Sequence, residues 1–130
     1  IDESYNSNPL SLGSALKNFD MMEVKNSKKH LLLGDMLELG QHSKKLHTII
    51  SRDINKTSIN SVSVVGKYIT ETYKNIDNSK KGLILKKNSQ IINLIKNHID
   101  NNDYLMIKGS NSTGLNNLTR ILKLGKYNAL

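Results

Sequence analysis

The chain alternates short apolar runs with segments of helical periodicity, and this alternation restricts its fold more than any other feature. Four apolar runs predict strands: 29–34 (KHLLLG), 61–66 (SVSVVG), 82–86 (GLILK) and 104–109 (YLMIKG). Five segments whose apolar residues recur at helical spacing predict helices: 9–22, 43–55, 67–75, 88–100 and 114–124. Because the runs are apolar throughout rather than alternating, we expect the strands to be buried on both faces.

Strands that alternate with helices are typical of a parallel sheet covered by helices. The sequence therefore predicts an α/β fold, Rossmann-like, with a mostly parallel sheet and helices on both faces. A length of 130 residues fits one domain, and no linker rich in Pro, Gly or Ser divides residues 1–130. Ile1 is interpreted as the end of a further strand whose earlier residues are missing.

Two absences from the composition limit the kind of protein this is. No apolar run approaches the roughly 18 residues of a transmembrane helix, so we expect no membrane span. Cysteine is absent, which excludes disulfides and thiolate metal sites. The lack of cysteine is compatible with the cytoplasmic location that we expect.

The net charge of +8 raises the question of nucleic-acid binding. The basic residues are nearly all lysines spread along the chain, and Arg52 and Arg120 are the only arginines. Arginine is the usual side chain for bidentate recognition of phosphates and base edges. The chain also has one Phe, five Tyr and no Trp, which leaves few rings for base stacking. We therefore expect no nucleic-acid partner, and a basic nucleic-acid-binding domain is the least favoured alternative.

Polar or glycine-containing stretches follow the predicted strands, where ligands bind in parallel sheets. These stretches are 2–9 (DESYNSNP), 34–40 (GDMLELG), 66–67 (GK) and 108–114 (KGSNSTG). The last has two glycines, as phosphate-binding loops do, but lacks the Lys-Ser/Thr pair that completes such a loop. We expect it to make at most an anion contact at a helix start.

Two groups of polar side chains carry the remaining chemistry. Asp35 and Glu38 share one face of a helical turn, so they could act in acid–base chemistry or bind an ammonium group. The alternative, which these residues alone favour, is that the carboxylates cap backbone N–H groups. Asn8 before Pro9 is a natural helix cap, but capping does not explain the nearby Tyr5 and Asn6.

The four histidines do not form a metal-binding pattern. His42 and His47 are five residues apart, so they do not share a helical face as ligands at i and i+4 do. His98 is expected on the surface of its helix. We therefore expect no metal site.

Three motifs in order resemble the C-terminal domain of the Mur ligase family, and within it the branch that adds D-alanyl-D-alanine to UDP-N-acetylmuramoyl-tripeptide. DESYNSNPLSLGSAL (2–16) is similar to Asp-x-x-Tyr-Asn-Ala-Asn-Pro-x-Ser of that branch. LLLGDMLELGQHSKKLH (31–47) resembles Leu-Gly-Asp-Met-x-Glu-Leu-Gly followed by a His. LMIKGSNSTGL (105–115) is similar to Val-Lys-Gly-Ser-Arg. The resemblance covers nearly the whole chain.

The resemblance implies a division of labour between domains. Family members have an N-terminal domain for the UDP-sugar, a central ATPase domain and a C-terminal Rossmann-like domain, and we expect the first two to lie outside this chain. The full enzyme phosphorylates the tripeptide carboxylate with ATP and Mg²⁺, which the central domain mainly binds. The amine of D-alanyl-D-alanine then attacks the acyl phosphate while the third domain closes over the site and excludes water. The fragment alone is expected to hold no catalytic residue and to be inactive.

The resemblance also implies roles for individual residues. Four residues are expected to face the nucleotide: Asp2, Tyr5, Asn6 and Asn8. From their charge and their position at strand ends, five more are expected to face the dipeptide: Asp35, Glu38, Lys108, Gly109 and Ser110. Of these, Lys108 and N–H groups at the helix start suit its carboxylate, and a carboxylate at position 35 or 38 suits its ammonium group.

The chain departs from the family pattern at two positions. Asn111 stands where the family has Arg, so any contact of that Arg with the substrate carboxylate would fall to Lys108 or loop N–H groups. Ser7 replaces the usual Ala, which is a small change. The alternative function is a stand-alone nucleotide- or anion-binding module without ligase activity.

Overall fold

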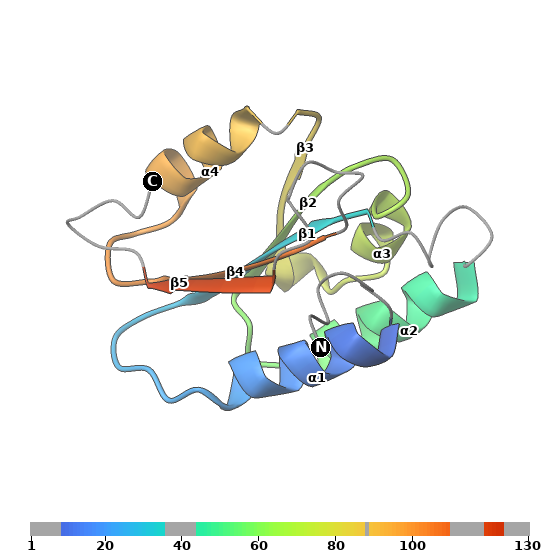
Figure 1. Ribbon diagram of the computed structural model, residues 1–130, viewed down its shortest axis with the longest axis horizontal. Helices are drawn as coiled ribbons and strands as arrows, with labels where there is room; N and C mark the ends of the chain where they lie inside the picture. The colour runs from blue at the N-terminus through green and yellow to red at the C-terminus, as the bar shows by residue number, and fades with distance from the viewer. Residues whose placement is uncertain (1–8, 36–43, 88, 110–118, 124–130) are drawn as a thin grey trace.

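A five-stranded sheet forms the centre of the protein, as the computed structural model shows for residues 9–35, 44–87, 89–109 and 119–123 (Figure 1). The strands lie in the order β3-β2-β1-β4-β5. Their bounds are Lys29–Gly34 for β1, Ser61–Val65 for β2, Lys81–Leu85 for β3, Tyr104–Lys108 for β4 and Thr119–Lys123 for β5. The first four strands are parallel and β5 is antiparallel to β4, which confirms the predicted mostly parallel sheet.

Helices cover both faces of this sheet, as predicted. Their bounds are Pro9–Met21 for α1, Lys44–Asn55 for α2, Thr70–Lys74 for α3 and Gln90–His98 for α4, and a short 3₁₀ helix, η2, spans Asn78–Lys80. Figure 1 shows α1 and α2 below the sheet and α4 above it. The two faces therefore have separate hydrophobic cores.

The larger core lies between the sheet and α1, α2 and α3. Leu12, Leu16 and Phe19 are buried at helical spacing on α1, so this face of the helix packs inward. Leu31 and Leu33 of β1 point into the same core. The end of α1 is fixed by a neighbouring strand, because Lys29 Nζ of β1 donates hydrogen bonds to the carbonyl oxygens of Asp20 (2.7 Å) and Met22 (2.6 Å).

The smaller core lies under α4. Leu32 of β1 points to this side, opposite its neighbours in sequence, and packs with Leu94, Ile95 and Leu105. Both sides of β1 are therefore buried, which explains why its sequence is apolar without alternation.

A bulge lies in β3, where Gly82 and Leu83 together oppose Ser63 of β2. The pairing of β2 with β3 shifts between Val62 and Val64, and the Leu83 N–H donates a hydrogen bond to Ser63 Oγ (3.0 Å). A Cβ atom at position 82 would overlap Ser63 Oγ and lie 3.1 Å from the Val62 carbonyl oxygen, so the close pairing at this bulge favours glycine.

The prediction of a helix over 114–124 is wrong for residues 119–123, which form β5. The remaining residues 114–118 and 124 lie outside the described part of the chain. A short apolar segment does not distinguish helix from strand by periodicity alone. The backbone of β4 offers an edge for pairing, and residues 119–123 fill it in antiparallel register, with Met106 opposite Ile121. Ile1, interpreted as the end of a strand, also lies outside the described residues.

Candidate functional site

The carboxyl ends of β1, β2 and β4 lie side by side at one edge of the sheet. Gly34 at the end of β1 pairs with Val65 of β2, and Leu33 pairs with Lys108 at the end of β4. In chain order, β2 and β3 are added on one side of β1, and β4 is added on its other side. The direction in which strands are added therefore reverses at β1. Ligands of open α/β sheets bind at such a reversal. We therefore take this carboxyl edge as the candidate site.

Asp35, the residue after β1, binds the loop that follows β2. Its Oδ2 accepts a hydrogen bond from the Lys67 N–H (2.9 Å), and its Oδ1 accepts those of Tyr68 (2.9 Å) and Ile69 (2.8 Å). Gly66 makes this approach possible, because its φ is +135° and an added Cβ would lie 2.6 Å from the Asp35 carboxylate. The carboxylate thus joins two strand ends. The capping alternative holds for Asp35, and its contact with a dipeptide stays a prediction.

Lys108 lies at the end of β4, beside the strand that carries Asp35. Its side chain is 1% exposed, and the following Gly109 is also buried. A buried ammonium group needs hydrogen bonds or an opposite charge, because an unpaired charge in the protein interior is costly. Lys108 is therefore a buried, positively charged side chain at the carboxyl end of β4.

Residues 1–111 match the family described as Mur ligase, glutamate ligase domain. This chain belongs to the Mur ligase family. The match takes in the carboxyl ends of β1, β2 and β4, so the candidate site is part of the shared domain.

Three curated relatives of this Mur ligase domain carry the same name. UDP-N-acetylmuramoyl-tripeptide--D-alanyl-D-alanine ligase of Buchnera aphidicola is 36% identical over 116 residues, which are 87% of this chain and 24% of that protein. Ligases of the same name from Rickettsia prowazekii (28% over 118 residues; 91% of this chain and 26% of that protein) and Bacillus subtilis (27% over 126 residues; 94% and 27%) are also similar. The chain thus spans about a quarter of the length of these relatives.

Two solved structures have the same fold as this Mur ligase domain. A MurF from Acinetobacter baumannii matches with a TM-score of 0.65 and 27% identity, over 87% of this chain and 24% of that one. A MurF ligase from Thermotoga maritima in complex with ADP matches with a TM-score of 0.66 over 90% of this chain and 26% of that one. At 21% identity the second likeness shows the fold alone.

The structure brings together three of the nine predicted site residues. Asp35, Lys108 and Gly109 lie on neighbouring strand ends of the carboxyl edge. The other six lie outside the described residues: Asp2, Tyr5, Asn6, Asn8, Glu38 and Ser110. Their roles stay predictions.

A buried polar network between α2 and α3 was not predicted. His47 is 1% exposed, and its Nδ1 lies 2.7 Å from Thr72 Oγ1. Ser51 Oγ lies 2.8 Å from the carbonyl oxygens of both His47 and Thr72, which share its one hydroxyl proton. The sequence signal was a polar residue inside the apolar spacing of 43–55. The network connects α2 with α3, the helices that follow β1 and β2 in the chain.

Metal ligands and membrane spans can be assessed for the described part of the chain. Within it, no three His, Cys, Asp or Glu side chains are grouped so that they could hold a metal ion. His98 is exposed on α4, as predicted. Among the same residues, no helix combines the length and apolarity needed to cross a bilayer.

Proposed function

We propose that this chain is the C-terminal closing domain of an ATP-dependent ligase that joins D-alanyl-D-alanine to UDP-N-acetylmuramoyl-tripeptide in the cytoplasm. The observation that carries the proposal is the 36% identity to a ligase of that name across 87% of the chain. In this proposal, the UDP-sugar and central ATPase domains lie in the part of such ligases that this chain does not span, which is about three quarters of their length.

The carboxyl edge is the surface that turns toward the central domain in this proposal. Lys108 suits the carboxylate of D-alanyl-D-alanine, because an ammonium group forms strong charge-assisted hydrogen bonds with carboxylates. Gly109, the next residue of the chain, belongs to the same dipeptide contacts. Asp35 holds the neighbouring loop in place, and Glu38 and Ser110 complete the dipeptide contacts. Asp2, Tyr5, Asn6 and Asn8 face the nucleotide.

ATP and Mg²⁺ enter this proposal through the rest of the enzyme. When bound, ATP supplies the phosphoryl group that activates the tripeptide carboxylate. Both oxygens of the Asp35 carboxylate already accept backbone hydrogen bonds, and the described residues contain no cluster of metal ligands. We therefore assign Mg²⁺ to the central domain. The closing domain positions the amine and excludes water from a bond that hydrolyses easily.

The first test is reconstitution. The chain alone is expected to release no ADP from ATP, and to support ligation of D-alanyl-D-alanine when joined to the two upstream domains. Ligation that proceeds at the same rate without this chain contradicts the proposal. Binding of nucleotide by the chain alone, with no ligation in the joined protein, supports the stand-alone module instead.

The second test is the substitution Lys108→Met in the joined protein, with Lys96→Met on the exposed surface of α4 as the control. Loss of a charged hydrogen bond to substrate costs about 1.5–3 kcal/mol, so the KM for D-alanyl-D-alanine should rise by roughly tenfold or more. The KM for ATP should stay unchanged. A rise in both KM values, or none in either, would remove Lys108 from the dipeptide site.

A further inference from the structure

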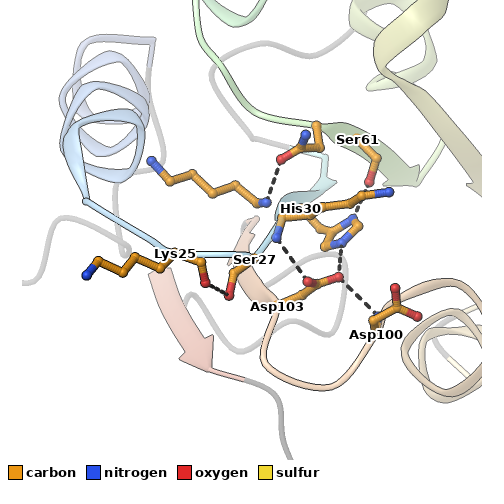
Figure 2. Close-up of polar contacts among 9 residues, drawn as sticks. Lys25, Ser27, His30, Ser61, Asp100 and Asp103 are labelled. Atoms are coloured by element: carbon orange, nitrogen blue, oxygen red, sulfur yellow. Dashed lines mark hydrogen bonds and ion pairs between the residues drawn. The ribbon is translucent and has the colours of Figure 1, made fainter.

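A second polar site lies at the opposite edge of the sheet, where the parallel strands begin. His30 of β1 lies between Asp103, which precedes β4, and Ser61, the first residue of β2 (Figure 2). His30 Nε2 is 2.8 Å from Asp103 Oδ2, and His30 Nδ1 is 2.6 Å from Ser61 Oγ. We call these three residues the Ser–His–Asp cluster. A nucleophile, a base and a third group that orients the base are the parts of a serine hydrolase site.

The position of the protons follows from the surroundings of Asp103. Burial by itself raises the pKa of Asp103, but hydrogen bonds from the Lys28 N–H, the His30 side chain and the Asp100 N–H outweigh it. The pKa of this carboxyl therefore lies below its ordinary value of 3.8, and the group is ionised at neutral pH. An ionised carboxylate accepts the Nε2–H of His30. In the neutral imidazole Nδ1 then carries no proton, so it accepts the hydroxyl proton of Ser61.

A cavity of about 340 Å³ opens onto this cluster. His30 and Ser61 form part of its wall, and Leu83, Leu94 and Ile99 form an apolar part. The base and its partner are sheltered, since His30 is 6% and Asp103 4% exposed, whereas Ser61 is half-buried. The volume is at the small end of ligand pockets and fits a short acyl group.

We propose that Ser61 is an activated nucleophile and that the cluster cleaves small carboxylic esters with short apolar acyl groups. Ser61 Oγ attacks the ester carbonyl carbon, and its proton passes to His30 Nδ1. The C–O bond to the alcohol breaks, and His30 gives the proton to the leaving oxygen. Water then attacks the acyl-Ser61 ester with His30 as base, which releases the carboxylic acid and restores the Ser61 hydroxyl. Asp103 is the positioning residue that fixes the His30 ring.

The negative oxygen of such a reaction needs hydrogen-bond donors. Asn60 and Lys28 both line the cavity and have donor groups in their side chains. Asn60 Oδ1 accepts the Lys29 N–H (2.8 Å), so the hydrogen-bond donor of this side chain is its amide nitrogen. This activity goes beyond the proposed ligase function, because it uses the amino ends of the strands rather than their carboxyl ends.

The test uses the full chain with p-nitrophenyl acetate as substrate and a fluorophosphonate as covalent probe. We expect ester hydrolysis above the buffer rate and a probe adduct that mass spectrometry places on Ser61. Ser61→Ala should lower the enzymatic rate about 100-fold or more and abolish the adduct. Ser79→Ala, at an exposed serine of η2, is the matched control and should change neither.

To show that Asp103 positions the His30 ring, the experiment needs a measurement that would not change if Asp103 only stabilised the fold. Asp103→Asn should lower kcat, leave KM nearly unchanged and shift the pH profile of hydrolysis, because it alters the His30 tautomer. If circular dichroism shows that this variant is unfolded, His30→Gln takes its place and should lose the probe adduct. Wild-type hydrolysis by Ser61→Ala, an adduct on another residue, or no adduct at all overturns the proposal.

Discussion

Asp35 is held by three backbone N–H groups of the loop after β2, and this determines what it offers the candidate site. Its charge orders the residues that precede α3, which begins at Thr70. A ligand near Asp35 therefore meets a carboxylate whose oxygens are already shared. Asp35 therefore affects the carboxyl edge by holding this loop in place, and not only through contact with a ligand.

Alanine substitutions at Gly66 and at Gly13 should change the free energy of unfolding in opposite directions. Gly66→Ala should lower the free energy of unfolding by about 2 kcal/mol, because Gly66 has a φ of +135° and its new Cβ would lie 2.6 Å from Asp35. Gly13→Ala in the interior of α1 should raise it by about 0.5–1 kcal/mol, since the added Cβ would lie 3.9 Å from Asp53 Oδ2, an ordinary contact. Urea unfolding measures both. Equal effects would contradict the described conformation of Gly66.

Asp103 gives the protein a pH-dependent contribution to stability. Its pKa is lowered in the folded state, so this stability is present at neutral pH and is lost as pH falls below the ordinary value of 3.8 and through the folded pKa. Asp103→Asn should therefore be less stable than the wild type at pH 7. The difference in unfolding free energy should shrink at pH 3, where the wild-type carboxyl is becoming protonated. Denaturant unfolding at the two pH values checks this, and a difference that grows in acid would contradict it.

Some residues of these sites can be placed from the sequence and others cannot, for a physical reason. Asp35 and Lys108 follow predicted strands, so the geometry of a parallel sheet placed them at one edge. The partners of Asp35 lie 32 to 34 residues away, and Asp103 is 73 residues from His30. Such pairs depend on the register between strands, which apolar patterns do not fix.

The four parallel strands were predicted within one residue at each end, whereas β5 was predicted as part of a helix. A buried strand carries a continuous apolar run that ends at a glycine or a polar residue. β5 lies at the edge of the sheet, and Ile121 is 42% exposed, so this signal is absent. Pairing with β4 decides its conformation, and that pairing is not a local property of the sequence.

Two substitutions at Ile121 distinguish strand from helix. Ile121→Thr should retain more stability than Ile121→Ala, because β-branched residues favour strands and alanine favours helices. The expected difference in unfolding free energy is up to about 1 kcal/mol, measured by urea unfolding. The reverse order would mean that residues 119–123 are helical.

The two cores of the molecule differ in size, and their contributions to stability should differ as well. Phe19 is fully buried in the larger core, so Phe19→Ala should cost about 3–5 kcal/mol, a large part of the stability of a typical domain. Leu94 is 4% exposed in the smaller core, and Leu94→Ala should cost about 2–3 kcal/mol. Urea unfolding compares them. A larger loss at Leu94 would contradict the assignment of the main core.

The place of β1 between β2 and β4 has a consequence for how the chain is made. The N–H of Lys28, just before β1, donates a hydrogen bond to Asp103 Oδ1, and Asp103 lies 75 residues further along the chain. At a synthesis rate of roughly 5–20 residues per second, one edge of β1 waits about 4–15 seconds on the ribosome for its neighbour. During that interval the nascent chain exposes an unpaired apolar strand, which is the form most open to pairing with another molecule. The central sheet is therefore completed only after β4 has been synthesised.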